Sequence, residues 1–542
     1  MKRALVTSLI MVCGLSLVGC EGSKNASSEA SYDLPKAKIS VSKDTPSWKK
    51  DKEKANLTWY VNYDWFAQKW GKDYATKFIT EDTNVSITYQ AGTSENLNTK
   101  MASGDLPDII TLDGSDPLVK DAAKWALPLD VLSKKYDPYF YNGASKEEVT
   151  KYYTTKDGHL YGYPNFATTK ADYEKGGLYG NEAFLVRKDI YEQIGKPDMS
   201  TPEGFIAALK KVQELGLKDD SGKPIVPLGT WPLLAPADSK IFSDTLADMI
   251  GVPLTKNDKQ YDRYMDKDFQ KWYSTLSQAR RDGLTDRDML TMNDDNNNAQ
   301  VINGSYFAYF QPNIIGDTDP MSQRSLKSPD APYIAVNGPA STIGRKTMVQ
   351  GPSLQGWTLT FISKKVKNPE KAMELITYLT SPEGDTVMNY GREGKTYKMV
   401  DGKPVLNKDL LTLKQTDPSK YETEIGLGTH PWVTDSALLS RQMGLSQFPA
   451  ALMQQKEWTM DHLIFPGKVT NLDAMLSKES GRNLNKIEQN WSQTVAKILN
   501  AKSDSEVEKY FKDFKSYRES TGWKQITDER NKQIEYNIKK GQ

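Results

Sequence analysis

The chain has 542 residues, and its 71 Lys and Arg residues balance its 70 Asp and Glu residues. This balance gives no electrostatic case for a nucleic-acid partner, and the length is too great for one compact core, so at least two lobes are expected. The 12 Trp and 28 Tyr residues outnumber the 15 Phe residues. Trp and Tyr combine a flat apolar face with a polar edge, which is typical of sites for amphipathic ligands such as sugars.

The N-terminus predicts a lipoprotein signal peptide over residues 1–19. Two basic residues precede an uncharged run, residues 4–19, that is too short for a comfortable membrane span. The run ends in LVGC, which resembles a bacterial lipobox, so we expect lipidation of Cys20; an ordinary signal peptide with a chance Cys is the alternative. Cys13 lies in the segment to be removed, so the mature chain offers neither a disulfide framework nor a thiol nucleophile.

Residues 20–55 are rich in Ser, Lys, Ala, Glu and Asp and lack sustained periodicity. This composition predicts a lipidated, flexible tether between the membrane and a folded body. No second apolar stretch in the sequence approaches membrane-spanning length, so we expect the lipid to be the only anchor.

Residues 56–114 alternate between strand and helix patterns. Strands are predicted over 56–65, around 85–91 and over 106–114, with helices from Phe66 to Phe78 and from Thr93 or Ser94 to Gly104. This order predicts a parallel sheet with crossover helices, in which ligands approach the carboxyl ends of the strands. The candidate ligand contacts at those ends are Asp64, Trp65, Ser94, Asn96 and Asp113.

Later elements are also predicted by local signals. Thr201 and Pro202 begin a helix that stops at Gly216, and Asn368 begins another that runs to 380. The segment 304–313 indicates a buried strand, and the last 80 residues predict peripheral helices.

Several stretches, in this order, resemble family 1 of the extracellular solute-binding proteins of bacterial ABC importers. They are MASGDLPDIITLDG, WALPLD, GHLYGYP, FLVRKDIYEQIGKPDMSTPEGF, ARRDGLTDRD and NPEKAMELITYLTSPEGDTVMNYGREG. The resemblance covers roughly residues 57–440 and is strongest to the long members, which bind oligosaccharides.

The resemblance implies an α/β, two-lobe periplasmic-binding-protein-like fold (type II), with the ligand cleft between the lobes and extra C-terminal helices. It places residues 56–165 and about 305–370 in the N-terminal lobe, and about 166–304 and 371–542 in the C-terminal lobe. It also implies that the lobes close on an oligosaccharide and deliver it to ABC permease subunits served by a cytoplasmic ATPase. We expect a monomer, lipid-anchored at the outer face of a bacterial membrane, of the Gram-positive type.

Further candidate contacts come from the aromatic residues of this pattern. Tyr161 and Tyr163 flank a glycine at the expected lobe crossing, with hinge packing as their alternative role. Three tryptophans lie in or directly after turn sequences rich in Pro or Gly, which could hold their rings toward a ligand. They are Trp231, Trp357 and Trp432. Structural alternatives also remain for the earlier candidates, because Trp65 can pack under a helix, Ser94 can cap one and Asp113 can close a turn.

Arg392 and Glu393 follow a helix that begins at Ser381 and stops at Gly391. Arg392 has the fork geometry to bind a hydroxyl or a sugar carboxylate. The alternative is a structural ion pair, and a catalytic role is the least favoured interpretation of this pair.

The sequence predicts no cofactor. Some long relatives carry a calcium loop at the place of residues 217–227, but here Asp219, Asp220 and Ser221 are followed by Lys223 and two apolar residues. The later acidic ligands are missing, so this loop is predicted to be degenerate. Residues 293–300 lack the glycine and the final Glu of an EF-hand loop and predict a polar surface loop.

Two other protein classes remain to be weighed. A secreted glycoside-active enzyme would need two carboxylates across a cleft, and a structural adhesin would be expected to show repeats. The three histidines, His159, His430 and His462, lie in no recognisable metal or triad motif, and the chain shows no internal repeat. The resemblance to the solute-binding proteins of ABC importers therefore decides between the classes, and it implies a non-catalytic binding lipoprotein.

Overall fold

The structure, a computed structural model, describes residues 32–233, 235–312, 320–430, 433–443, 448–473 and 476–541. Residues 37–542 form one unit, and residues 1–36 form another. The predicted signal peptide and Cys20 lie outside the described residues, as does Trp432. Within these ranges, no helix is long and apolar enough to cross a membrane.

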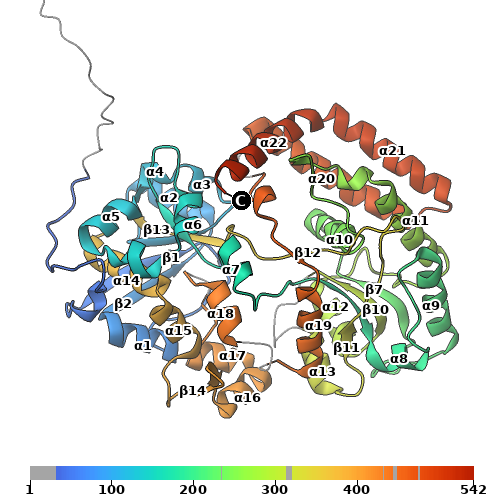
Figure 1. The fold of residues 1–542 in the computed structure, drawn as a ribbon, viewed down its shortest axis with the longest axis horizontal. Coiled ribbons are helices and arrows are strands. Elements are labelled where there is room, and N and C mark those ends of the chain that lie inside the picture. The colour runs from blue at the N-terminus through green and yellow to red at the C-terminus, as the bar shows by residue number, and fades with distance from the viewer. Residues whose placement is uncertain are drawn as a thin grey trace, which may run out of the picture. The chain divides into compact units, whose positions relative to one another are not determined.

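The first sheet confirms the predicted alternation of strands and helices (Figure 1). Its order is β2-β1-β3-β13-β4, with β5 beside β13, and β1 pairs in parallel with both β2 and β3. The antiparallel strand β13 begins opposite the end of β3, where Thr358 faces Asp113. The carboxyl ends of β1, β2 and β3 and the start of β13 therefore lie at the same edge of the sheet. The strands are β1 (Ala55–Val61), β2 (Val85–Ala91), β3 (Ile109–Asp113), β4 (Ala126–Leu127), β5 (Gly162–Pro164) and β13 (Thr358–Ser363).

The second sheet has the order β11-β6-β10-β7, with β10 parallel to β7 and antiparallel to β6. Its strands are β6 (Ala183–Arg187), β7 (Val226–Thr230), β10 (Tyr306–Gln311) and β11 (Tyr333–Ala335). The carboxyl ends of β7 and β10 and the start of β6 share one edge. Short pairs lie outside both sheets: β8 (Thr255–Lys256) with β9 (Lys259–Gln260), β12 (Val349–Gln350) with β16 (Leu463–Ile464), and β14 (Tyr397–Val400) with β15 (Lys403–Leu406).

The lobe assignments of two stretches differ from the sequence prediction, one that contains β10 and β11 and one from residue 371 to residue 430. Strand β10 was expected in the N-terminal lobe, but it pairs with β6 and β7 of the second sheet. Helix α14 (Pro369–Thr380) was expected largely in the C-terminal lobe, but it packs against α5 and β13 of the first. Both segments are almost entirely buried, and an apolar segment carries no local signal for the sheet against which it packs.

The helices surround the two sheets (Figure 1). Those from the N-terminus to the second sheet are α1 (Tyr74–Thr83), α2 (Ser94–Ser103), α3 (Pro117–Lys120), α4 (Ala122–Trp125), α5 (Leu129–Tyr136), α6 (Glu147–Tyr153) and α7 (Lys170–Glu174). The next group is α8 (Lys188–Gln193), α9 (Pro202–Glu214), α10 (Pro236–Met249), α11 (Lys267–Arg281), α12 (Asp294–Ile302) and α13 (Pro320–Lys327). After α14 come α15 (Pro382–Tyr390), α16 (Lys408–Thr416), α17 (Pro418–Lys420), α18 (Ser436–Met443), α19 (Ala450–Met460), α20 (Lys478–Leu499), α21 (Asp504–Ser520) and α22 (Trp523–Lys539).

The predicted C-terminal helices are present and have a structural role. Helix α20 packs against α10 and α11 of the second lobe. Its Trp491 is buried, and its indole Nε1 donates a hydrogen bond to Ser243 Oγ at 2.9 Å. Phe511 and Phe514 of α21 belong to the same core. These helices therefore enlarge the core of the second lobe.

The chain passes between the lobes along residues 165–182 and along residues 336–357. Helix α7 and strand β12 of these two segments lie between the sheets in Figure 1. The segments are tied together, because the backbone N–H of Thr168 donates to the carbonyl of Ser353 at 2.8 Å. Tyr173 adds a bond from its hydroxyl to the carbonyl of Pro352 at 2.7 Å.

Part of the predicted tether is folded. Trp48 is only 2% exposed and packs edge-on against Tyr139 and Tyr378, with ring centroids 5.6 and 5.2 Å away. The Ser47 hydroxyl donates to buried Asp137 at 2.5 Å. The polar composition of this stretch favoured a flexible chain, but burial of one large aromatic side chain is enough to dock it on the first lobe.

Candidate ligand-binding site

Three aromatic side chains, which we call the aromatic platform, meet at the strand-end edge of the first sheet. They are Tyr63 and Trp65, which follow β1, and Trp357, which precedes β13. The Trp65 and Trp357 rings are stacked with centroids 6.2 Å apart and planes 11° from parallel, and Tyr63 lies 5.1 Å from each. Trp65 is 58% exposed and Trp357 is 39% exposed. The platform therefore offers a flat apolar surface to solvent.

The backbone of the sheet fixes this arrangement. The N–H of Gly114, just after β3, donates to the carbonyl of Trp357 at 2.8 Å, and Thr358 is in register with Asp113. Trp357 is thus held at the start of β13, which pairs with β3, and β3 in turn pairs with β1. Contiguous exposed apolar patches, unlike single exposed side chains, mark interaction sites, and the three adjoining rings form such a patch.

Carboxylates border the platform. The Tyr63 hydroxyl donates to Asp113 Oδ2 at 3.1 Å, and the Ser115 hydroxyl donates to Asp113 Oδ1 at 2.6 Å. Burial and the Asp113 charge raise the pKa of Tyr63 well above its usual range, so its phenol stays protonated and remains a donor. Asp64, beside Trp65, is exposed. These carboxylates are acceptors placed next to an apolar surface.

Ser94 belongs to a second polar group at the same edge. Its hydroxyl donates to Asp116 Oδ2 at 2.5 Å, and the Asn62 amide donates to Ser94 Oγ at 2.8 Å. Asn96, by contrast, completes the capping box of α2, because its Oδ1 accepts from the backbone N–H of Thr93 at 3.0 Å. Ser94 is thus joined to the strand ends, while Asn96 is engaged in holding its own helix.

The two tyrosines of the lobe crossing are buried. Tyr161 is 4% exposed and donates to Asp157 Oδ2 at 2.9 Å, and Tyr163 is 5% exposed and accepts from the backbone N–H of Lys146 at 3.1 Å. Burial raises the pKa of Tyr163 above its usual range. Trp231 follows β7 at the strand-end edge of the second sheet and is half-buried.

Arg392 follows α15, and its side chain packs against α1 rather than against the platform. Its Nη2 donates to Asp82 Oδ1 at 2.5 Å and to the carbonyl of Phe78 at 3.4 Å, and its guanidinium lies 5.4 Å from the Phe78 ring centroid. Within the described residues, no hydrogen bond, ion pair or ring contact joins it to the platform. This geometry is that of a structural brace between the end of α15 and α1.

Two neighbouring cavities lie close to the strand-end edge of the first sheet, and the three platform residues line neither of them. The larger, of about 880 Å³, begins at Gly114–Asp116 and Gln355–Gly356, next to Trp357, and extends to Tyr161 and α22. The smaller, of about 380 Å³, is lined by α10, α20 and α22 together with Gln350. The cavities share Ser115, Gln355 and Asn471, so they form neighbouring parts of one hollow between the lobes.

Sequence reasoning missed several of these residues. Tyr63 alternates with Trp65 after the same strand, and Asp116 caps α3 directly after β3, so both could have been found from local pattern. Gln350, Gln355 and Asn471 carry no such signal, because they come from connecting segments whose positions depend on the whole fold. The structure thus adds donors and acceptors from both sides of the hollow.

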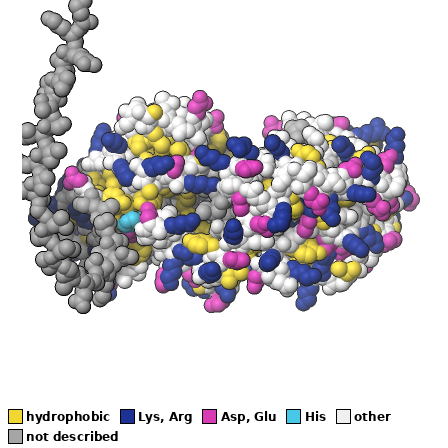
Figure 2. Space-filling model, turned by 90° about the horizontal axis from the view of Figure 1, so that it is seen from above, with side chains coloured by type: hydrophobic (Ala, Val, Ile, Leu, Met, Phe, Trp, Pro, Cys, Tyr) yellow, Lys and Arg dark blue, Asp and Glu magenta, His cyan; other side chains and the backbone are white. Residues whose placement is uncertain are grey.

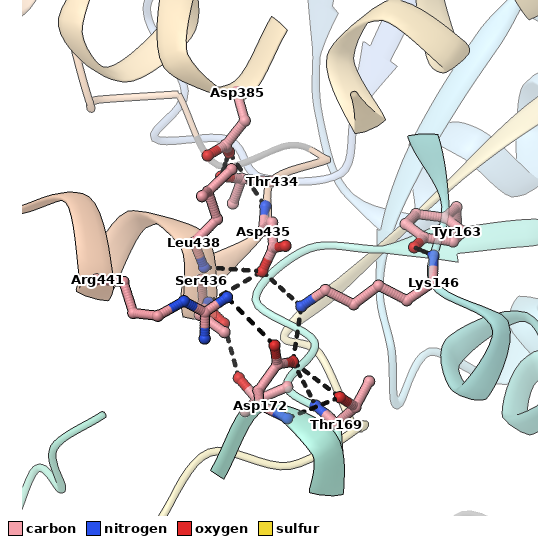
Figure 3. A network of polar contacts seen from close by, with 12 residues as sticks. Lys146, Tyr163, Thr169, Asp172, Asp385, Thr434, Asp435, Ser436, Leu438 and Arg441 are labelled. Carbon is pink, nitrogen blue, oxygen red and sulfur yellow. Dashed lines mark hydrogen bonds and ion pairs between the residues drawn. The ribbon is translucent and has the colours of Figure 1, made fainter. Parts of the chain in front are cut away.

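A network of ion pairs surrounds the lobe connections (Figure 3). Lys146 Nζ lies 2.8 Å from Asp172 Oδ2 and 2.6 Å from Asp435 Oδ1, and Arg441 Nη2 lies 3.3 Å from Asp172 Oδ1. Asp385 is fully buried and accepts from the Thr434 hydroxyl and, at 3.1 Å, from the Asp435 N–H. Burial raises the pKa of Asp385 to about 7. These groups join α6, α7, α15 and α18.

The loop considered for calcium has its carboxylates engaged by protein donors. Asp219 accepts from the Ser305 hydroxyl at 2.6 Å and from the Ser221 hydroxyl at 2.7 Å. Asp220 is paired with Arg324 at 2.6 Å and with Lys327 at 3.2 Å. In the part of the chain that the structure describes, no group of three or more His, Cys, Asp or Glu side chains is arranged to hold a metal ion.

The surface carries no dominant charge on the face shown in Figure 2, where Lys and Arg side chains are interspersed with Asp and Glu side chains. This distribution agrees with the formal net charge of +1 for the whole chain. The hollow between the lobes is thus distinguished by its aromatic and hydrogen-bonding lining rather than by a surrounding charge of one sign.

Comparison with known proteins assigns the fold and the family. Residues 61–386 match the family of bacterial extracellular solute-binding proteins. The chain is 25% identical over 217 residues to the fructooligosaccharide ABC transporter substrate-binding protein FusA of Streptococcus pneumoniae. The aligned region covers 38% of this chain and only 37% of that relative's length.

Three solved structures illustrate the likeness in fold. The alginate-binding protein AlgQ2 without calcium ion matches with 16% identity and a TM-score of 0.64, over 90% of this chain and 99% of that one. An extracellular solute-binding protein from Bifidobacterium longum subsp. infantis matches with 17% identity and a TM-score of 0.62, over 89% and 98%. An EF-hand mutant of Streptococcus pneumoniae FusA with fructo-nystose matches with 18% identity and a TM-score of 0.62, over 89% and 99%.

These matches confirm the predicted two-lobe α/β fold, including its C-terminal helices. The family match spans more than half of the chain, from the end of β1 into α15. The protein belongs to the bacterial extracellular solute-binding proteins.

Proposed function

We propose that the protein is a non-catalytic lipoprotein that closes its two lobes on an oligosaccharide and delivers it to the permease of an ABC importer. The observation that carries this proposal is the aromatic platform, whose two tryptophans are stacked and exposed at the strand-end edge of a two-lobe fold. Ligands of open α/β sheets bind at that edge.

The chemistry of the platform suits a sugar. Pyranose and furanose rings carry C–H faces, which stack on Trp and Tyr, and hydroxyl rims, which need acceptors and donors. Asp113 and Asp64 provide acceptors beside the platform, and Gln355 and Asn471 provide amides in the adjoining hollow. The named ligands of the relatives, fructooligosaccharide for FusA and alginate for AlgQ2, support carbohydrate as the class.

Delivery and anchoring are further parts of the proposal. The LVGC sequence supports lipid attachment at Cys20 on the outer face of the membrane, and family membership supports a permease with a cytoplasmic ATPase as partner. Labelling of growing cells with a palmitate analogue tests the anchor: the wild-type chain should be labelled and the Cys20→Ala variant should not.

A thermal-shift screen of residues 21–542 against neutral and acidic oligosaccharides tests the binding function. A ligand at about 100 times its Kd should add roughly 2.7 kcal/mol to the free energy of unfolding, a shift of a few degrees for lobes of this size. The proposal expects one class to raise Tm and to be recovered unchanged. Consumption of the sugar would instead support a glycoside-active enzyme, and no shift with any sugar would contradict binding.

A further inference from the structure

Helix α22 forms one wall of the larger cavity. The first lobe contributes Tyr153, Tyr161 and Phe361 to the cavity, and α22 contributes Gln533 and Tyr536 from the opposite side. The cavity is about 880 Å³, which lies within the range of small-molecule sites and leaves room for a sugar unit. Gln355 and Gly356, which directly precede Trp357, line the cavity, as does Gly114, whose N–H donates to the Trp357 carbonyl at 2.8 Å, so one end of the cavity lies beside the backbone that holds the platform.

Helix α22 is fixed to the second lobe. The amide of Asn537, which is fully buried, donates to the carbonyls of Lys468 and Thr470 at 3.1 and 2.8 Å. Arg530 Nε lies 2.6 Å from Asp473 Oδ1. The helix therefore moves with the second lobe and is not a loose C-terminal extension.

The same helix reaches the first lobe at its far end. Lys540 Nζ, one residue beyond α22, donates to the carbonyl of Lys151 in α6 at 3.1 Å. Nearby, the hydroxyls of Tyr152 and Thr470 lie 3.4 Å apart. Along this wall of the cavity, protein contacts therefore join the second lobe to α6 of the first.

From this arrangement we propose that α22 closes one end of the ligand cleft, so that the cavity receives the terminal unit of an oligosaccharide while the platform stacks a following unit. This inference rests on the proposed function and adds that the ligand is recognised by one chain end. A chain that continued beyond the cavity would collide with Tyr536 and with the contact between Lys540 and α6. The lysines at the rim of the cavity, Lys120, Lys156 and Lys532, add hydrogen-bond donors for hydroxyls.

The test uses cello-, malto-, xylo- and fructo-oligosaccharides and oligogalacturonides of two to six units, titrated against residues 21–542. The oligomer that binds is then offered with a bulky fluorophore at one terminus or at the other. We expect one labelled form to bind about a hundredfold more weakly, because a displaced terminal ring loses the contacts of about ten atoms, and the other form to bind within about threefold of the free oligomer.

The double variant Tyr536→Ala/Lys540→Ala should bring the rejected form to within about tenfold of the free oligomer. Tyr74→Ala is the matched control, since Tyr74 is 40% exposed on α1 and Tyr536 is 36% exposed; the control should leave the discrimination intact. Equal binding of both labelled forms to the wild-type protein, or unchanged discrimination in the double variant, would overturn the inference while leaving the binding function standing. Failure of every oligosaccharide to bind would contradict both.

Discussion

Trp48 and the pair of Trp65 and Trp357 show how differently the same side chain is used in one lobe. Trp48 is 2% exposed and packs edge-on between two tyrosines, where it docks the N-terminal segment. Trp65 and Trp357 are 58% and 39% exposed and stack on each other. Burial makes the first a stabilising residue, and exposure next to hydrogen-bonding groups makes the others candidates for ligand contact.

The largest expected effect on stability comes from Trp48→Ala. Loss of a buried Trp leaves a cavity that costs about 3–5 kcal/mol, and the variant should lose this much in chemical denaturation. Its affinity for the oligosaccharide should be unchanged. Trp65→Ala is the matched control, and its exposed side chain should cost less than about 1 kcal/mol. Equal losses of stability in the two variants would contradict the contrast.

Trp357→Ala should show the reverse behaviour. Removal of a stacking surface from the platform should weaken oligosaccharide binding by about 2 kcal/mol, roughly thirtyfold. The free energy of unfolding should change little, because 39% of this side chain is already exposed. Calorimetric titration of the variant measures the affinity, and wild-type affinity would remove Trp357 from the site.

The buried Asp385 predicts that the free energy of unfolding depends on pH. This dependence arises near the lobe connections and not at the platform. Burial raises its pKa from the ordinary 3.8 to about 7, so the native state holds a proton that the unfolded state has released. Its contribution to stability is full below about pH 4 and is lost as the pH rises through 7.

Asp385→Asn removes this titration, so the variant should gain stability relative to the wild-type protein between pH 5 and pH 8. The gain should be of the order of 1–3 kcal/mol in urea denaturation. Asp137 and Glu374, whose pKa values burial raises to about 6 and about 8, titrate in both proteins and cancel in the difference. A difference that stays constant over this pH range would refute the prediction.

The smallest effect is expected for Arg392→Ala. The pair of Arg392 with Asp82 is partly exposed, with side chains 27% and 18% accessible, so its loss should cost about 1 kcal/mol. Since the guanidinium contacts α1, the affinity for the oligosaccharide should not change. A tenfold weaker affinity would instead place Arg392 in the site.

Local sequence signals predicted much of the fold and part of the candidate site. The order of strands and helices over residues 56–114 and the caps Thr201 and Asn368 agree with the periodicity and capping residues. The first helix differs, because it was predicted over Phe66–Phe78 and instead begins at Tyr74, where Asp73 caps it, and runs to Thr83. Trp65, Trp357 and Asp113 were found because strand ends and turns can be recognised locally. The sheet to which β10 belongs and the packing of Trp48 depend on contacts distant in sequence, which no short pattern contains.

The hollow between the lobes illustrates the same limit. Asn471 lies more than 100 residues from Gln355 in the chain, yet both line the two cavities, and Gln355 Oε1 accepts from the Asn471 N–H at 2.8 Å. Arg392 had two interpretations from sequence, and only the position of Asp82 on α1 distinguishes them. Long-range contacts therefore decide which polar residues face the hollow.

The most direct test of the central claim is a calorimetric titration of the wild-type protein and of Trp65→Ala/Trp357→Ala with the oligosaccharide selected by the thermal-shift screen. The account predicts one site per wild-type chain, no measurable binding by the double variant, and nearly equal thermal stability of the two proteins without ligand. Retention of wild-type affinity by a folded double variant would contradict the claim that the platform of Tyr63, Trp65 and Trp357 binds the sugar.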